Sequence, residues 1–194
     1  MFTEMAQNGA LYFLSLRPWL QMLGVSEFAL RLPSALAGVA AVPMLWLLAR
    51  RLVGEGIVPL VAAALLAINP YAVWYGQEGK MYTIITLLAL GASWCWINGV
   101  ESRKWRWWFV YTALISLAMY THLLAILIIP LHLLWFLIAW PTARRAWKGY
   151  LVALALLTLP YLPLLAWQWR MLLADRPVTG FQFTPLPEML KTIL

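Results

Sequence analysis

The sequence predicts an all-α fold, a polytopic helical bundle in a membrane with about six transmembrane helices and an N-terminal interfacial helix. Of its 194 residues, 64% are hydrophobic and 11% are charged, and the mean hydropathy is +0.79. A soluble domain carries about 25% charged residues, so a soluble protein is excluded. Charge-free runs are separated by short basic segments, and a run of about 20 apolar residues is long enough to cross a membrane.

Residues 9–24 are expected to form the interfacial helix. This segment is apolar, but it contains Arg17 and Pro18 and is too short to span a membrane. Tyr12 and Trp19 suit the headgroup level, where aromatic side chains gather. The start of the chain has neither the basic residues nor the apolar core of a signal peptide. A translocated start with no span before it predicts that the chain is a fragment.

The first span is expected to follow a helix-start signal. Ser26 is suited to cap the helix, and Pro33 lies near the start of the span. Glu27 and Arg31 are four residues apart and therefore share a helix face, where they can form an ion pair.

The charge-free runs predict where the helices cross. Four runs fit one crossing each, but the run from Trp107 to Ala143 would extend about 55 Å as a single helix. It is therefore expected to fold back as a hairpin with its tip near Tyr120, Thr121 and His122. The predicted spans are 32–50, 57–75, 81–99, 107–120, 123–140 and 149–170.

Three basic clusters separate these spans. They are Arg50 with Arg51, then Arg103, Lys104 and Arg106, and then Arg144, Arg145 and Lys148. The positive-inside rule assigns them to the cytoplasm, so both termini are expected on the other side. The expected regions are an outer juxtamembrane segment (1–30), the bundle (31–170) and an outer loop that is cut short (171–194). Because these clusters account for most of the net charge of +7, nucleic-acid binding is not expected.

The stretch NPYAVWYGQEGKMYT, residues 69–83, places polar side chains at the outer mouth of the predicted bundle. Pro70 disfavours helical geometry at Asn69 and removes a backbone donor, which predicts a kink in the helix. Gly76 and Gly79 allow the following turn to pack closely against a ligand or another helix.

Glu78 and Lys80 stand in this turn, two residues apart, whereas Glu78 and Tyr82 are four apart and can share a helix face. Side chains two apart on a helix do not face each other, so Glu78 and Lys80 are expected to contact different partners. Ionisable groups that face a bundle interior are functional candidates. A structural alternative stays open, in which Lys80 anchors the helix at the interface and Glu78 is a solvated carboxylate.

The histidines and the cysteine receive brief interpretations. His122, with an ordinary pKa of about 6.5, is suited to act as an acid, a base or a ligand, or else is a polar turn residue. His132, two residues after Pro130, is expected to pack against neighbouring helices. Cys95 is the single cysteine, so no disulfide can form within the chain. No metal-spaced cluster, phosphate-binding glycine loop or nucleophile–base–acid set is recognised.

Five short motifs occur in the order GALYFLSLRPWLQMLG, SEFALRLPSALAG, ARRLVG, NPYAVWYGQEGKMYT and MYTHLLAI. This order resembles the membrane glycosyltransferases that use polyprenyl-phosphate sugars, a family that includes the protein O-mannosyltransferases and the bacterial aminoarabinose transferases for lipid A. In bacterial relatives one block reads like YSQEARMY. Here it is matched by Tyr75, Gln77, Glu78, Lys80 (for Arg), Met81 and Tyr82.

The resemblance implies a C-type glycosyltransferase that takes a sugar from a lipid phosphate with inversion, without a nucleotide sugar or other cofactor. Such a reaction needs a cation for the leaving phosphate and a carboxylate base for the acceptor hydroxyl. The family's base is generally an Asp in the first outer loop, whereas the single Asp here is Asp175, in the late loop. The chain is therefore expected to be truncated at both ends. The candidate catalytic residues are Glu78, Lys80 and His122, and the candidate substrate-binding residues are Gln77, Tyr82, Tyr75 and Glu4.

The partners implied are the polyprenyl-phosphate sugar, a lipid, glycan or protein acceptor, and the membrane, with the plasma membrane of a bacterium as the expected location and the site facing outside. Two alternatives remain open. One is a transporter or lipid-binding subunit that holds an anionic headgroup without chemistry. The other is an inactive fragment in which only packing remains.

Overall fold

A computed structural model of the chain describes residues 10–157 together with residues 162 and 166. The elements in this part are all helices, which confirms the predicted all-α fold. In chain order they are α1 (Ala10–Leu23), α2 (Glu27–Val53), α3 (Ile57–Ile68), α4 (Pro70–Gln77), α5 (Tyr82–Ser102), α6 (Trp105–Thr121), the 3₁₀ helix η1 (Leu123–Leu127), α7 (Ile128–Ile138), α8 (Trp140–Ala143) and the 3₁₀ helix η2 (Arg144–Ala146). Residues 147–157 are again helical.

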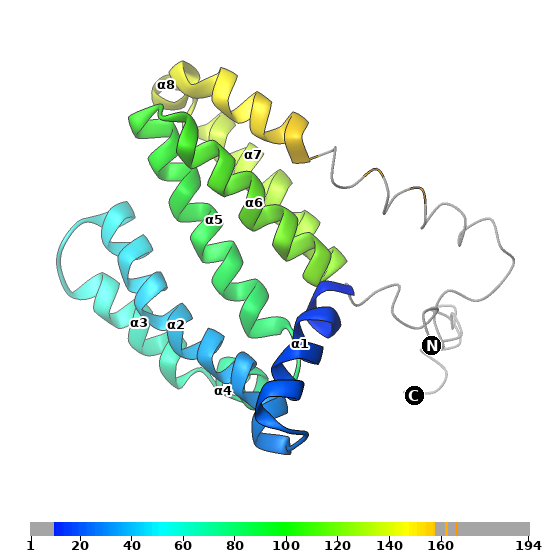
Figure 1. Cartoon of the computed structure of the whole chain (residues 1–194). Helices are drawn as coiled ribbons and strands as arrows, with labels where there is room; N and C mark the ends of the chain where they lie inside the picture. Colours follow the sequence, from blue (N-terminus) through cyan, green and yellow to red (C-terminus); the bar gives the residue numbers. More distant parts are fainter. Residues whose placement is uncertain (1–9, 158–161, 163–165, 167–194) are drawn as a thin grey trace, which may run out of the picture.

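Helix α5 is the centre of the bundle. Helix α2 packs on one side of it and α6 on the other, while α3 packs against α2 (Figure 1). Helix α1 contacts both α2 and α6. Because α5 and α6 run in opposite directions, the start of α5 and the end of α6 lie at the same end of the bundle, next to the end of α4.

By length and composition, two to four candidate membrane spans are found in the described residues, where six were expected. Within the described residues, α2 with 27 residues and α5 with 21 are each long and apolar enough to cross a membrane. Two bent pairs raise the number to four if each pair is one span, namely α3 with α4 at 51° and Leu123–Ile138 with Trp140–Leu157 at 88°. Hydropathy shows how long an apolar run is, but it does not show where the helix within the run breaks. Such breaks leave several of the helices here shorter than a membrane span.

The predicted start of the first long helix is confirmed. The backbone N–H of Ala29 donates to Ser26 Oγ over 3.1 Å, so Ser26 is the N-cap of α2. Glu27 and Arg31 form the expected ion pair on the exposed face. An acidic residue in the first turn also interacts favourably with the helix dipole.

The core between α5, α6, α7 and residues 147–157 is rich in aromatic rings. His132 is only 1% exposed and lies 3.0 Å from Ser93 Oγ through Nε2 and 3.1 Å from the Tyr111 hydroxyl through Nδ1. The prediction that His132 is a packing residue is therefore confirmed. Side-chain hydrogen bonds of this kind join helices within an apolar bundle.

Candidate functional site

The kink predicted at Asn69 and Pro70 is confirmed and forms one wall of the candidate site. Asn69 is extended, and its Oδ1 accepts hydrogen bonds from the backbone N–H groups of Tyr71 and Ala72, at 2.9 and 3.1 Å. Pro70 occupies the first turn of α4, where its missing donor has no consequence. The chain therefore changes direction by 51° between α3 and α4, and α4 contacts α5.

Glu78 and Lys80 form an ion pair, contrary to the expectation that they contact different partners. Lys80 Nζ lies 3.1 Å from Glu78 Oε2. Helix α4 ends at Gln77, and the backbone N–H of Lys80 donates to the carbonyl of Glu78 over 2.7 Å. Such a bond closes a three-residue turn, so the helical spacing rule on which the expectation rested does not apply here.

The ion pair is open to water on the lysine side. The Lys80 side chain is 56% exposed and that of Glu78 is 24% exposed. Glu78 raises the pKa of the Lys80 ammonium above its ordinary value of 10.5, first through their close contact and then through its charge. Glu78 Oε2 is shielded from solvent and accepts no well-aligned hydrogen bond in the described part of the chain. The charge of Lys80 Nζ, 3.1 Å away, is therefore what stabilises this buried oxygen. Lys80 therefore keeps its charge at neutral pH.

Ser34 of α2 holds the loop that carries this pair. Its hydroxyl, which is fully buried, donates to the carbonyl of Lys80 over 2.6 Å. The hydroxyl of Thr83 in turn donates to the carbonyl of Ser34 over 2.7 Å. These two bonds tie the Lys80 backbone and the start of α5 to α2.

Gly79 allows the same loop to approach α2 closely, as the sequence predicted. A Cβ at this position would lie 2.8 Å from Leu30 Cγ and 3.3 Å from the Leu30 carbonyl oxygen. Sequence reasoning identified Gly79 but missed Ser34 and Thr83. In the sequence, each of the two is only a hydroxyl residue in an apolar stretch, and this pattern does not predict which residue the hydroxyl bonds to.

Tyr75, Tyr82 and His122 come together from three different segments. The ring centroids of Tyr75 and Tyr82 are 4.6 Å apart, and those of Tyr82 and His122 are 6.0 Å apart. His122 lies at the break between α6 and η1, where its Nδ1 accepts from the backbone N–H of Leu124 over 3.1 Å. The neutral ring therefore carries its proton on Nε2. Burial lowers the pKa of His122 below its ordinary value of 6.5, which favours this neutral form.

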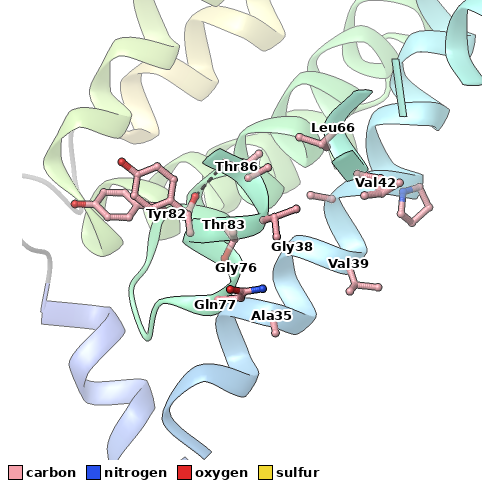
Figure 2. Close-up of a pocket in the computed structure, with 16 residues that line it drawn as sticks. Ala35, Gly38, Val39, Val42, Leu66, Gly76, Gln77, Tyr82, Thr83 and Thr86 are labelled. Atoms are coloured by element: carbon pink, nitrogen blue, oxygen red, sulfur yellow. Dashed lines mark hydrogen bonds between the residues drawn. The ribbon is translucent and has the colours of Figure 1, made fainter. Parts of the chain in front are cut away.

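A cavity of about 590 Å³ opens beside these residues, between α2, α3, α4 and α5 (Figure 2). Its wall is mainly apolar and includes Val39, Val42 and Leu66, while Gln77 and Tyr82 add polar groups to its lining. Thr86 Oγ1, also in the lining, donates to the carbonyl of Tyr82 over 3.0 Å. The full lining is Ala35, Gly38, Val39, Ala41, Val42, Pro43, Leu66, Ala67, Ala72, Val73, Tyr75, Gly76, Gln77, Tyr82, Thr83 and Thr86.

The structure thus brings most of the predicted site residues to one end of the bundle. Gln77, Tyr75 and Tyr82 line the cavity, whereas Glu78, Lys80 and His122 do not line it. Glu78 and Lys80 follow Gln77 directly in the chain, and His122 is in ring contact with Tyr82. Glu4 and Asp175 lie outside the described residues. Within the described part, no three His, Cys, Asp or Glu side chains are grouped so as to hold a metal ion.

Apolar helices around an apolar cavity, with a charged loop beside its polar residues, define a helical membrane protein with a candidate ligand site. The chain belongs to the family described as dolichyl-phosphate-mannose-protein mannosyltransferase, whose sequence profile matches residues 9–167.

Comparison with a curated protein agrees with this family. The chain is 29% identical over 147 residues to "Putative mannosyltransferase YycA" of Bacillus subtilis (strain 168). The match covers 72% of this chain and 21% of that protein, so the chain spans about a fifth of the length of its relative. No solved structure matches the chain.

Proposed function

We propose that this chain forms part of a membrane glycosyltransferase, which transfers a sugar from a polyprenyl-phosphate donor to an acceptor at the non-cytoplasmic face. The observation that carries the proposal is the Lys80–Glu78 ion pair, held in a loop directly after Gln77, which lines an apolar cavity of about 590 Å³. A polyprenyl-phosphate sugar has the matching parts, namely a long apolar chain and an anionic phosphate. Membership of the mannosyltransferase family supports the same reaction class.

Lys80 is the residue we assign to the donor phosphate. Sugar transfer leaves the lipid phosphate with an additional negative charge, and a fixed cation stabilises that charge as it develops. Because the pKa of Lys80 lies above its ordinary value of 10.5, the side chain is an ammonium throughout the neutral range. Ser34 fixes the backbone carbonyl of Lys80, so the loop is held before the donor arrives.

Glu78 is assigned to positioning Lys80, because their side chains are 3.1 Å apart. His122 is assigned as a hydrogen-bond donor to the sugar or phosphate. Its Nδ1 is occupied by the Leu124 N–H, so Nε2–H is the group left to donate. Tyr82, in ring contact with both Tyr75 and His122, adds a hydroxyl beside the cavity. The base that deprotonates the acceptor is not assigned to these residues.

We propose the following topology for the bundle. The site end faces outside, and the basic clusters at the ends of α2 and α5 and around η2 lie in the cytoplasm. The crossings are then α2, α3 with α4, α5, α6, η1 with α7, and the segment that begins at residue 147. An outer segment (1–30) precedes the bundle (31–170), and an outer loop (171–194) follows it.

The direct test measures transfer of labelled mannose from polyprenyl-phosphate mannose by the full-length protein in nanodiscs. Lys80→Ala is expected to reduce transfer by about a hundredfold or more, since it removes a cation from the developing charge. Lys104→Ala, which removes an equal charge at the opposite end of α5, is the control and is expected to leave transfer unchanged. Equal rates for Lys80→Ala and the control would remove Lys80 from the donor site.

A further inference from the structure

A second cavity, of about 470 Å³, lies at the end of the bundle opposite the Lys80 loop. It is formed by the ends of α2 and α5 together with α7, α8 and η2. Helix α8 lies beside the end of α5, at the place where the chain bends by 88° after α7 (Figure 1). The residues that line it are Arg51, Leu52, Trp96, Ile97, Val100, Glu101, Arg103, Trp135, Ala139, Thr142 and Arg145.

Each of the three basic clusters contributes one arginine to this cavity. They are Arg51 from the first cluster, Arg103 from the second and Arg145 from the third. The positive-inside rule requires basic residues near the cytoplasmic ends of helices, but it does not require them to converge on one cavity. The convergence is therefore an observation that topology alone does not explain.

The charges in the cavity are unbalanced. Arg51 forms an ion pair with Glu101, the one carboxylate in the lining. Among the described residues, no carboxylate forms an ion pair with Arg103 or Arg145. Two guanidinium groups are thus left without an acidic partner in a partly enclosed space, which attracts an anion.

Arg103 also has an unusual backbone conformation. It is the C-cap of α5, with φ 56° and ψ 18°, and it is the one non-glycine residue with positive φ in the described chain. Glycine is the usual residue at this position, since a side chain is disfavoured in the left-handed region. Backbone conformations of this kind cluster at functional sites. Arg103 therefore places a guanidinium at a position where glycine is usual.

Two tryptophans contribute apolar surface to the lining of the cavity. The rings of Trp96 and Trp135 are stacked with centroids 4.5 Å apart, and both residues line the cavity with Ile97 and Val100. A cavity lined by both arginines and aromatic rings suits a headgroup whose phosphate continues into an apolar chain. Basic cavities between helices on the cytoplasmic side are known to bind anionic lipid headgroups.

We propose that this cavity binds a phosphate group through Arg103 and Arg145, with Arg51 as a third cation. The two possible sources are the phosphodiester headgroup of an anionic lipid and free phosphate. This site lies at the other end of the bundle from the Lys80 loop and does not depend on the glycosyltransferase proposal.

Thermal unfolding of the full-length protein provides the test. The protein is placed in phosphatidylcholine nanodiscs, in the same nanodiscs containing phosphatidylglycerol, and in phosphatidylcholine nanodiscs with added inorganic phosphate. The pocket pair is Arg103→Gln with Arg145→Gln, and the control pair is Lys104→Gln with Arg144→Gln. Each pair removes one charge from each of the same two clusters, but the control residues do not line the cavity.

Phosphatidylglycerol is expected to raise the melting temperature of the wild type and of the control pair equally. The pocket pair is expected to lose this shift, with binding weakened by about an order of magnitude. If inorganic phosphate alone reproduces the shift, the phosphate source is free in solution, and if only the lipid does so, the source is the headgroup.

If both pairs lose the rise in melting temperature equally, the rise depends on surface charge alone, and the proposal is overturned. No shift of the wild type by either source would also overturn it. Should the pocket pair fail to insert, the single variants Arg145→Gln and Arg144→Gln are compared in the same way, with lipid retention measured by native mass spectrometry.

Discussion

The hydroxyl of Ser34 donates to the backbone carbonyl of Lys80 over 2.6 Å and so joins two positions 46 residues apart. Ser34 is fully buried, and its own carbonyl accepts from the hydroxyl of Thr83. The candidate phosphate-binding lysine is therefore fixed from outside its own loop, by a helix that begins before the first predicted span.

Ser34→Ala is expected to leave the carbonyl of Lys80 without its partner and to destabilise the fold by about 1–3 kcal/mol. Because the loop is then less well fixed, we expect kcat/KM for sugar transfer to fall about ten- to a hundredfold. The control is Ser26→Ala, which removes the cap of α2 and destabilises by about 1 kcal/mol without touching the loop. If both variants lose the same activity, the effect is one of stability and Ser34 does not position Lys80.

The local features of the fold followed from the sequence, because each rests on residues that are neighbours in the chain. The Ser26 cap and the bend at Asn69 and Pro70 depend on backbone donors within a few positions. The burial of His132 followed from its place in an apolar run.

The features that the sequence did not predict depend on distant residues or on a break in regular structure. The Ser34–Lys80 bond joins α2 to the loop before α5, and no local pattern marks it. The Glu78–Lys80 pair was excluded by a spacing rule that holds only within a helix, whereas the chain there is a turn. Hydropathy likewise does not register the bend of 88° between Leu123–Ile138 and Trp140–Leu157, which lies inside an apolar run.

The pH dependence of transfer is expected to report the Glu78–Lys80 pair. Glu78 raises the pKa of Lys80 above 10.5, so the ammonium, and with it the stability that the pair contributes, persists below that pH and is lost as the pH rises through the raised value. Glu78→Gln removes the main cause of the shift. The alkaline limb of kcat/KM for transfer is therefore expected to move to lower pH in this variant.

The matched control for the pH profile is Lys80→Arg. Arginine keeps its charge throughout the accessible range, so the alkaline limb is expected to disappear even if the rate at neutral pH is reduced. A limb that persists in Lys80→Arg, or that does not move in Glu78→Gln, belongs to another group and would contradict the assignment.

The proposed topology predicts that His122, at the break between α6 and η1, faces outside. A cysteine at position 122, in a Cys95→Ser background, is expected to react with an impermeant maleimide on intact cells. Cys95 is only 4% exposed, so its replacement removes a weak background signal. The control is Thr142→Cys, exposed in α8 and predicted to be cytoplasmic, which should react only after permeabilisation. The reverse pattern of labelling would show that the bundle has the opposite orientation in the membrane and would contradict the proposed topology.

The apolar cavity near the site is expected to hold the isoprenoid chain of the donor, and filling it should weaken donor binding. Ala67 lines the cavity from α3, so Ala67→Trp places a large side chain in the volume of about 590 Å³. The control is Ala64→Trp, since Ala64 is exposed on the same helix and does not line the cavity. Both variants add the same apolar surface to α3, which separates blockage of the cavity from a general effect on insertion.

We expect Ala67→Trp to raise the KM for a long-chain polyprenyl-phosphate sugar about tenfold or more, while a short-chain donor is affected less because it occupies less of the cavity. The KM values of the long-chain and the short-chain donor are measured in each variant, and their ratio tests whether the cavity holds the donor chain. An equal increase for both chain lengths would mean that the tryptophan disturbs the Lys80 loop rather than the cavity. An unchanged KM in Ala67→Trp would place the donor chain elsewhere on the bundle, with Lys80 still able to contact the phosphate from its exposed side.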